Sequence, residues 1–443
     1  LFAWLAAAVV GWAWRWSPRL MLALPAPQAA RWGGLLLATA YAVLAGWGVP
    51  AQRTVLMVAA VTLLRAAGVH WPGPLVLLAA AFIVTLVDPW ALLQPGFWLS
   101  FMAVGLLIAS DPVRDATAPA ESWRQRARAL LLGGLRTQAV ATVGLAPLTL
   151  VFFQQLSLVG FVANLVAIPV VTLLVMPLSL LGVLLPPLWA LGAALVSGLL
   201  QGLGWLAAWP WAQWTVPAAP AWAVLPALAG GALLVMPLPW ALRLLGLPLL
   251  LPLLVPAVDR PPEGRFELLA LDIGQGTAVL VRTRKHLLVY DTGPLYGLES
   301  DAGQRVLVPL LRARGEPHVH LLMLSHRDGD HVGGAASLLQ RVPVAGLSSS
   351  LSDDHPLRAT AVPHQPCRAG LRWQWDGVDF ELLHPDADTS RPVARPNTVS
   401  CVLRVRGAQG SALLAGDIER AQELALVDRL GDGLRADVLL VPH

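Results

Sequence analysis

Four residues of types that commonly bind metal ions lie close together in the segment SHRDGDHVGG, residues 325–334. They are His326, Asp328, Asp330 and His331. Imidazole nitrogens and carboxylate oxygens together suit Zn, Mn or Fe. Two such ions held about 3.5–4 Å apart can activate water and stabilise the leaving oxygen of a phosphodiester. The segment therefore predicts a site for two divalent metal ions, Zn or Mn, in which Asp330 also orients the attacking water.

The cluster begins at the end of the segment HVHLLMLSH, residues 318–326, which is typical of a buried strand. Successive side chains of a strand point to opposite faces, so His326 and Asp328 can face one metal ion. Asp330 and His331 follow as the chain turns and can face a second ion. Four ligand-type residues in six positions, before a pair of glycines, are not easily explained by packing alone.

The rest of the C-terminal part alternates predicted strands with predicted helices. Strands are expected at 266–282 (two strands around a glycine turn), 286–293, 318–326, 378–385, 399–407, 411–417 and 436–443. Helices are expected at 306–315, 335–342 and 418–430. Mixed strands and helices, with polar residues where strands end, predict a two-sheet α/β sandwich with its site at the strand ends.

Other strand ends carry further candidate site residues. Asp417, in LLAGD, is expected to bridge two metal ions, and His443 ends the last strand as a candidate ligand. Asp291, in DTG, is either a ligand or, as we favour, a group that orients one. Asp272, in LDIGQG, is expected to organise a turn, with metal contact as the alternative.

Residues 1–258 have the composition of a membrane domain. The chain is 56% hydrophobic and only 13% charged, whereas soluble domains carry about 25% charged residues. Residues 129–258 contain two charged residues, Arg136 and Arg243. A membrane helix needs about 20 apolar residues, so we expect about eight to ten helical spans before residue 259.

Three polar residues within this membrane part are candidates for a channel. Arg53 and Asp88 lie within or beside apolar runs, and Asn164 lies in the run FVANLVAIPVV. Charged groups at membrane depth are costly and are usually functional. The alternative is that Arg53 and Asp88 lie at the ends of spans and reach water.

Charge is divided unevenly along the chain. Residues 1–258 carry 11 Arg and 4 acidic residues, whereas residues 259–443 carry 20 basic and 23 acidic residues. An acidic domain is unusual for a DNA-binding protein, which relies on positive surface. A local basic patch could still be formed by Arg282, Arg284, Lys285, Arg312, Arg314 and Arg327. The alternative is that these residues form an ordinary solvated face.

Cys367 and Cys401 are the only cysteines. They could pair in an oxidising compartment or stay free in a reducing one. The chain begins with Leu1 inside an apolar run and stops at His443, so we expect it to be cut at both ends.

The ordered motifs of the C-terminal part resemble the metallo-β-lactamase superfamily. DTG, the loop H-x-D-x-D-H, LLAGD and a strand ending in His443 occur in the superfamily's order. Asp328 stands where the superfamily usually has a histidine, which makes the site richer in carboxylates and favours a harder metal such as Mn. Asn397 stands where the superfamily's next histidine is expected, and His384 is an alternative donor.

Together with the membrane part, the motifs resemble the ComEC family of DNA-internalisation competence proteins. The C-terminal motifs are LDIGQG, YDTG, SHRDGDHVGG and AGDIE; the membrane segments are VPAQRTVLM (49–57), VDPWALLQPGFWLSFMAVG (87–105) and FVANLVAIPVVTLLVMPLSLLG (161–182). The resemblance covers essentially the whole chain. The family's second C-terminal histidine and its N-terminal OB-like domain have no counterpart in this sequence.

The resemblance implies both an architecture and a function. The architecture is a polytopic α-helical membrane domain (1–258) followed by a metallo-β-lactamase-like αββα sandwich (259–443), truncated at its C-terminus. The function is a channel that passes single-stranded DNA inward across the bacterial cytoplasmic (inner) membrane. A nuclease-like domain on the extracytoplasmic side would degrade the other strand of the incoming double-stranded DNA. Implied partners are DNA, membrane lipid, other DNA-uptake proteins and further copies of the chain.

Two other functions stay open on this sequence. The hydrolase-like domain could be catalytically idle and serve as a gate or docking module, which the Asn397 substitution favours. The chain could also be a membrane-anchored hydrolase of a non-nucleic phosphodiester, because the superfamily's fold supports many chemistries.

Overall fold

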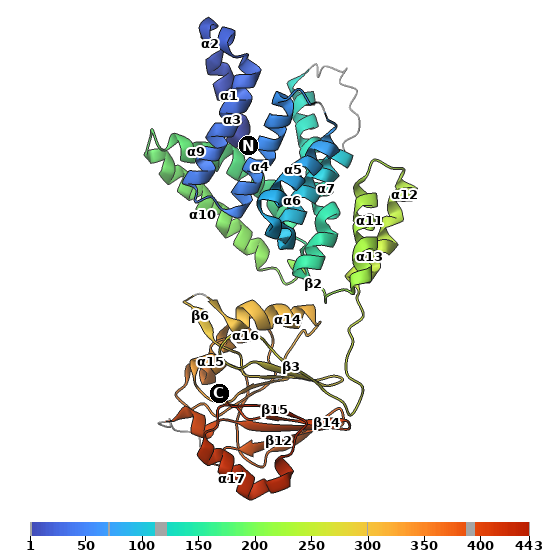
Figure 1. Cartoon of the computed structure of the whole chain (residues 1–443), viewed down its shortest axis with the longest axis vertical. Coiled ribbons are helices and arrows are strands. Elements are labelled where there is room, and N and C mark those ends of the chain that lie inside the picture. Colours follow the sequence, from blue (N-terminus) through green and yellow to red (C-terminus); the bar gives the residue numbers. More distant parts are fainter. Residues whose placement is uncertain (1, 70, 111–121, 299, 387–394, 443) are drawn as a thin grey trace. The chain divides into compact units, whose positions relative to one another are not determined.

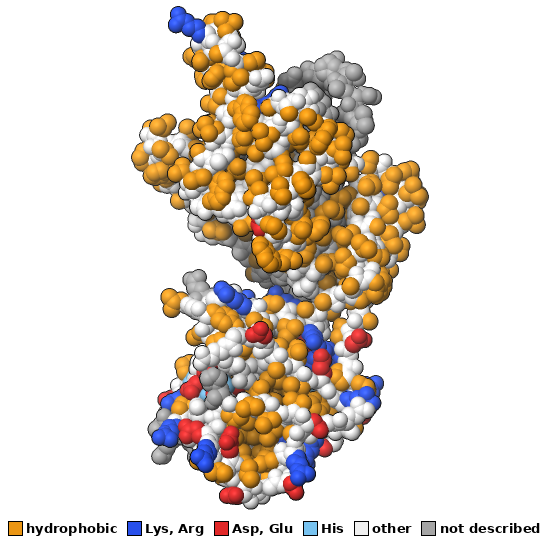
Figure 2. Space-filling model, viewed as in Figure 1, with side chains coloured by type: hydrophobic (Ala, Val, Ile, Leu, Met, Phe, Trp, Pro, Cys, Tyr) orange, Lys and Arg blue, Asp and Glu red, His pale blue; other side chains and the backbone are white. Residues whose placement is uncertain are grey.

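The computed structural model describes residues 2–69, 71–110, 122–298, 300–386 and 395–442. The chain divides into two compact units. Unit 1 comprises Leu1–Thr215 and Ala219–Pro256, and unit 2 comprises Val216–Ala218 and Ala257–His443. Apolar side chains dominate the visible surface of unit 1, whereas charged side chains of both signs are spread over unit 2 (Figure 2).

Unit 1 is built from helices (Figure 1). Its α-helices are α1 (Phe2–Trp14), α2 (Pro18–Ala23), α3 (Ala26–Leu44), α4 (Val49–Ala66), α5 (Gly73–Val87), α6 (Pro95–Ser110), α7 (Trp123–Phe153), α8 (Gly160–Pro169), α9 (Met176–Leu181), α10 (Pro187–Ala207), α11 (Val224–Val235), α12 (Trp240–Leu244) and α13 (Gly246–Leu254). Shorter elements are η1 (Pro89–Leu93), β1 (Gln155–Ser157), η2 (Val170–Val175), β2 (Gln213–Thr215) and η3 (Ala221–Ala223).

The described part of unit 1 contains four helical stretches that are long and apolar enough to cross a membrane. They are Val49–Ala66, Leu131–Phe153, Gly160–Leu181 and Pro187–Ala207. Shorter apolar helices are Phe2–Trp14, Gly73–Val87, Pro95–Ser110, Ala221–Val235 and Trp240–Leu254. A helical region with candidate spans is therefore confirmed, and the expected number of spans stays a prediction.

Small residues allow the helices of unit 1 to approach closely. A Cβ on Gly230 would lie 2.6 Å from the carbonyl oxygen of Gly246, so the backbones of α11 and α13 touch. A Cβ on Gly231 would lie 2.8 Å from Cγ of Pro147 on α7. Close contact through small residues is the usual way in which membrane helices pack. It joins α7, α11 and α13 into one tight group.

Unit 2 contains two main sheets. The first has the strand order β10-β9-β8-β5-β4-β3 and the second β11-β12-β13-β14-β15. The strands of the first are β3 (Glu267–Ala270), β4 (Val279–Arg282), β5 (Leu287–Tyr290), β8 (Leu321–Leu324), β9 (Leu347–Ser349) and β10 (His364–Pro366). Those of the second are β11 (Arg372–Trp375), β12 (Val378–His384), β13 (Val402–Gly407), β14 (Gly410–Leu414) and β15 (Val438–Leu440). A separate hairpin is formed by β6 (Leu295–Gly297) and β7 (Ser300–Asp301).

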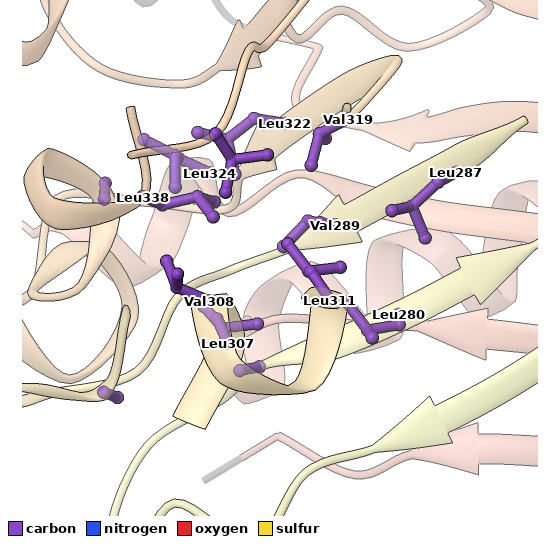
Figure 3. Close-up of a cluster of buried hydrophobic side chains, with 14 of the residues drawn as sticks. Leu280, Leu287, Val289, Leu307, Val308, Leu311, Val319, Leu322, Leu324 and Leu338 are labelled. Atoms are coloured by element: carbon purple, nitrogen blue, oxygen red, sulfur yellow. The ribbon is translucent and has the colours of Figure 1, made fainter. Parts of the chain in front are cut away.

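Helices cover the outer face of each sheet (Figure 1). The first sheet is covered by η4 (Gly303–Leu307), α14 (Val308–Ala313) and α16 (Ala335–Arg341), and the second by α17 (Arg420–Leu430). Figure 3 shows the apolar cluster under α14 and α16, where Leu280, Val289 and Leu322 of the sheet face Leu307 and Leu311. A second cluster fills the space between the sheets. These four layers confirm the expected αββα sandwich.

A disulfide joins the two sheets within this inner core. Cys367 directly follows β10 of the first sheet, and Cys401 directly precedes β13 of the second. Both cysteines are buried. Of the two states that the sequence left open, the structure contains the paired one.

Candidate metal centre

The predicted metal-binding loop lies where strands of both sheets end. Ser325 and His326 directly follow β8, and the short helix α15 (Gly329–Val332) carries Asp330 and His331. Asp417 follows β14 of the other sheet. The two rigid sheets thereby place side chains that are far apart in the sequence at one edge of the sandwich.

His326, His331 and Asp417 form a buried cluster of ligand-type atoms. One nitrogen of each imidazole and one carboxylate oxygen all lie within 4.8 Å of one another. Nε2 of His331 lies 3.3 Å from Oδ2 of Asp417. The imidazoles are fully buried and Asp417 is 8% exposed. The structure thus brings together three of the six predicted ligands.

Both imidazoles direct an unsatisfied nitrogen into this cluster. Nε2 of His326 and Nε2 of His331 are buried and make no hydrogen bond. A buried polar atom without a partner costs about 1–3 kcal/mol. A divalent metal ion would remove this cost, because an imidazole nitrogen and a carboxylate oxygen are its ordinary ligands. The residues present therefore fit a divalent metal ion.

The other predicted ligands lie around these three. Oδ2 of Asp328 is 3.5 Å from Nε2 of His326, and the Asp328 side chain is 44% exposed. Asp330 is half-buried on α15, one residue before His331. His443 lies outside the described residues. Coordination of a metal ion stays a prediction for all six residues.

One serine hydroxyl joins the two imidazoles. Oγ of Ser325 lies 2.9 Å from Nδ1 of His326 and 3.3 Å from Nδ1 of His331. The hydroxyl donates its proton to Oδ2 of Asp291, 2.6 Å away. Its oxygen can therefore only accept from the rings, which places a hydrogen on each Nδ1. In its neutral form, a ring with that tautomer presents the lone pair of Nε2 to the cluster.

Asp291 supports the loop from behind. Its Oδ1 accepts a hydrogen bond from the backbone N–H of Ser325 at 2.6 Å, and its Oδ2 lies 2.8 Å from Nδ1 of His331. Asp291 has a φ of 57°, an uncommon backbone conformation that aims the carboxylate at the loop. A carboxylate behind a metal-binding histidine fixes the ring and raises its basicity. Asp291 thus has the contacts expected of an orienting group, and this role stays a prediction.

The two carboxylates determine the charge of the metal-free site. Burial lowers the pKa of His331, but the hydrogen bond of Nδ1 with Asp291 and the nearby carboxylates of Asp291 and Asp417 outweigh it and raise this pKa to about 10. Burial, and then the charge of His331, lowers the pKa of His326. Without a metal, the site therefore holds one imidazolium and one neutral imidazole.

Two glycines allow close backbone contacts between the metal-binding loop and neighbouring segments. Gly276, in the turn between β3 and β4, has a φ of 113°, and a Cβ there would overlap the carbonyl oxygen of Asp330. The next residue, Thr277, donates its backbone N–H to the same oxygen at 3.2 Å. A Cβ on Gly333 would lie 2.5 Å from the backbone nitrogen of Leu295. These contacts fix α15 in place.

The remaining predicted site residues have varied surroundings. Oδ1 of Asp272 accepts from the backbone N–H of Gly274 at 3.4 Å, as a turn-organising residue does. Nε2 of His384 donates to the carbonyl oxygen of Thr398 at 2.9 Å, which occupies that nitrogen. Oδ1 of Asn397 is buried and has no hydrogen-bond partner among the described residues. A ligand role for Asn397 stays a prediction.

Ion pairs engage three members of the predicted basic patch, one of which, Arg284, pairs with Glu263 at 3.2 Å. Arg282 is buried and donates to Glu316 and Glu267 at 2.8 Å each. Arg314 also pairs with Glu267. By contrast Arg327, which follows the candidate ligand His326, is exposed on the predicted metal-binding loop. It is the member of the predicted patch that lies on the same loop as the candidate ligands.

The three predicted channel residues have separate surroundings in unit 1. A Cβ on Gly96 of α6 would lie 2.9 Å from Nη1 of Arg53, so this guanidinium packs against the start of α6. Asp88 caps η1 by accepting from the backbone N–H of Trp90 at 3.1 Å. Asn164 is exposed on α8. A role in a channel stays a prediction for all three.

Three residues of the site were not predicted from the sequence, namely Ser325, Ser400 and Thr292. Oγ of Ser400 lies 3.2 Å from Nδ1 of His326 and accepts from the backbone N–H of Asp417 at 3.3 Å. Oγ1 of Thr292 donates to the carbonyl oxygen of His331 at 2.9 Å. In the sequence, only their positions next to ligand-type or motif residues could have indicated a role for these three residues. Serine and threonine are so common at such positions that this signal does not distinguish them.

Two family models match the two parts of the chain. The model described as Competence protein matches residues 2–241. The model described as Metallo-beta-lactamase superfamily matches residues 271–441. The first match ends before the described sheets of unit 2 begin, and the second includes the whole described metal-binding loop.

Similar proteins have been named in several bacteria. "Competence protein ComA" of Neisseria gonorrhoeae is 36% identical over 454 residues, covering 100% of this chain and 59% of that protein. "Uncharacterized protein YcaI" of Escherichia coli (strain K12) is 32% identical over 438 residues, covering 93% of this chain and 53% of that protein. The chain thus spans little more than half the length of these relatives. Among solved structures, "Rm3 metallo-beta-lactamase" is 15% identical with a TM-score of 0.29, covering 42% of this chain and 78% of that one.

Proposed function

The chain belongs to the competence protein family, and we propose on this premise that it takes up DNA across the bacterial inner membrane in natural transformation. In this proposal unit 1 forms a channel for one DNA strand. Unit 2 uses divalent metal ions, Zn or Mn, to hydrolyse the strand that is not transported. The candidate spans of unit 1 support the first role, and the buried cluster in unit 2 supports the second.

One observation carries the hydrolytic part of the proposal. Two buried Nε2 atoms without hydrogen bonds face the same space as the carboxylate of Asp417. A metal ion bound there supplies an activated water and stabilises negative charge on a phosphodiester. His326, His331 and Asp417 hold the ion, and Asp330 orients the attacking water. Exposed Arg327 contacts a DNA phosphate, as guanidinium groups commonly do.

The disulfide supports an extracytoplasmic position for unit 2. Disulfides persist in oxidising compartments, such as the periplasm, and are rare in the cytosol. Cys367 and Cys401 are paired and buried in the core of unit 2. A catalytic domain on that side would meet incoming double-stranded DNA before one strand enters the channel.

Reconstitution into lipid vesicles tests the transport part. Double-stranded DNA with a different fluorescent label on each strand is added to vesicles that contain the full chain and Mn or Zn. The proposal expects one label inside the vesicle on intact DNA and the other outside on short products. Two intact strands outside, with the protein folded and metal-loaded, would contradict it.

Two other functions have distinct outcomes in the same system. An idle domain would let one strand enter while the other stays intact, and Asn397, at the position of an expected histidine, favours this outcome. A hydrolase of a non-nucleic phosphodiester would cleave a small phosphodiester but leave both DNA strands intact, and DNA would not compete with the small substrate.

A further inference from the structure

Two isolated arginines meet in one pocket of unit 1. Arg136 and Arg243 are the only charged residues between positions 129 and 258, and 107 positions separate them. Arg136 lies on α7 and Arg243 on α12, yet both line a pocket of about 330 Å³. The rest of the lining is apolar and comes from α7 and from residues 234–237.

Helix ends fix both guanidinium groups at the pocket. Nη2 of Arg136 donates to the carbonyl oxygen of Ser110, the last residue of α6. Nε and Nη2 of Arg243 donate to the carbonyl oxygen of Leu234, in the last turn of α11, at 2.9 and 2.7 Å. These bonds use one N–H of Arg136 and two of Arg243. A guanidinium has five N–H groups, so most donors remain available to a ligand.

Among the described residues of unit 1, counter-ions for this pair are scarce. Asp88 is the one acidic residue in the described part of unit 1, and its carboxylate caps η1. Two like charges in a largely apolar unit are costly unless an anion lies near them. The helix-end carbonyls offer only partial negative charge. The pair therefore lacks a full countercharge within the described residues of this unit.

We propose that Arg136 and Arg243 bind the phosphate of an anionic phospholipid, with part of its acyl chains along the apolar wall of the pocket. Guanidinium groups recognise phosphate oxygens through paired hydrogen bonds. Basic pockets between membrane helices are known to bind lipid headgroups. The site is separate from the metal centre, and it does not depend on the hydrolytic function proposed above.

The pocket lining favours a lipid over a DNA strand. Ala139, Val140 and Val143 form one wall on α7, and Leu234 and Val235 contribute to the rest. An acyl chain gains by covering such a surface. A DNA strand would instead need cations spaced along its backbone and aromatic side chains for its bases. This lining contains neither beyond the two arginines.

Native mass spectrometry of the full, delipidated chain tests the proposal. The chain is titrated with phosphatidylglycerol or with phosphatidylcholine that carries the same acyl chains. The wild-type protein should bind phosphatidylglycerol about tenfold more tightly, since bonds to charged groups are worth roughly that factor. The Arg136→Gln/Arg243→Gln variant should lose the preference, and the Arg136→Lys/Arg243→Lys variant should keep part of it.

A charge-matched control separates this site from a general effect of charge. Arg15→Gln/Arg19→Gln removes two exposed arginines from the α1–α2 region and should keep the full preference. Equal affinity of the wild-type protein for both lipids would overturn the proposal without any variant. An unchanged preference in a folded Arg136→Gln/Arg243→Gln protein would also overturn it. Displacement of phosphatidylglycerol by a single-stranded oligonucleotide, lost in the same variant, would assign the pocket to DNA instead.

Discussion

At the candidate metal centre one serine hydroxyl contacts Nδ1 of both imidazoles. Replacing Ser325 by Ala removes the acceptor that both Nδ1 atoms share and the donor to Asp291. Loss of such an outer contact typically lowers metal affinity by about 10–100-fold. We expect this loss in Ser325→Ala, measured by competition for Zn with a chelator of known affinity. Ser348→Ala, which changes another buried serine outside the metal-binding loop, should keep the affinity within about twofold.

Metal binding should release a proton from His331. The metal-free chain holds this imidazole protonated, because its pKa is raised to about 10. A metal can coordinate only the deprotonated nitrogen, so the apparent affinity should rise with pH and level off near pH 10. Calorimetry at pH 8 in two buffers with different ionisation enthalpies should show release of about one proton. Asp291→Asn should reduce this release, and an equal release in that variant would contradict the assignment.

The sequence identified ligand-type residues more readily than the residues that support them. His326 and His331 were proposed from the density of ligand-type residues in one loop, and Asp417 from its place at the end of an apolar strand. Ser400 could not be predicted, because only the fold brings its hydroxyl to Nδ1 of His326. Ser325 is adjacent to His326 in the sequence, but serine is too common for its role to be recognised there. The sequence likewise could not show that the guanidinium of Arg282 is buried and forms ion pairs with Glu267 and Glu316.

At the scale of elements, the turn between β3 and β4 holds the metal-binding loop. Gly276→Ala would force a side chain against the carbonyl oxygen of Asp330 and displace α15. Gly274→Ala is a matched control, because Gly274 also has a positive φ, 77°, but a Cβ there meets nothing within 4 Å. We expect Gly276→Ala to lower Zn affinity by about tenfold or more, whereas Gly274→Ala costs only backbone strain of about 1 kcal/mol. Equal Zn affinity in the two variants would show that the turn does not support the loop.

Long, strongly patterned elements could be predicted from the sequence, and short ones could not. The strands β8, β12 and β13 and the helix α17 lie within their expected ranges. No strand was expected between residues 343 and 377, where the structure has β9, β10 and β11. These strands have three or four residues each, with polar sequences such as HQP, and tertiary pairing rather than local preference determines them.

For the molecule as a whole, the disulfide is expected to contribute much of the stability of unit 2. It closes a loop with a sequence separation of 34 residues, and a bridge of this kind contributes about 2–4 kcal/mol. Cys367→Ala/Cys401→Ala should therefore lower the free energy of unfolding by about that amount, as measured by pulse proteolysis in urea on the full chain. A change below about 0.5 kcal/mol would show that the bridge is dispensable.

The change from an apolar part to a part rich in charged residues could be seen from composition alone. Charge and apolar content change abruptly near residue 258, and unit 2 begins its continuous run at Ala257. Composition could not show that two of the charged residues of unit 1 line the same pocket. Arg136 and Arg243 are remote in the sequence, and only the packing of α7 and α11 brings them to one pocket.

Cleavage of DNA by the full chain tests the central claim most directly. Double-stranded DNA with an end label is incubated with the chain and Mn or Zn, beside His331→Gln and Asp330→Ala variants whose folding is verified. The metal centre predicts metal-dependent release of short products that falls by at least about 100-fold in both variants. Intact DNA in the presence of a wild-type chain shown to contain bound metal would contradict the claim, as would equal cleavage by the variants.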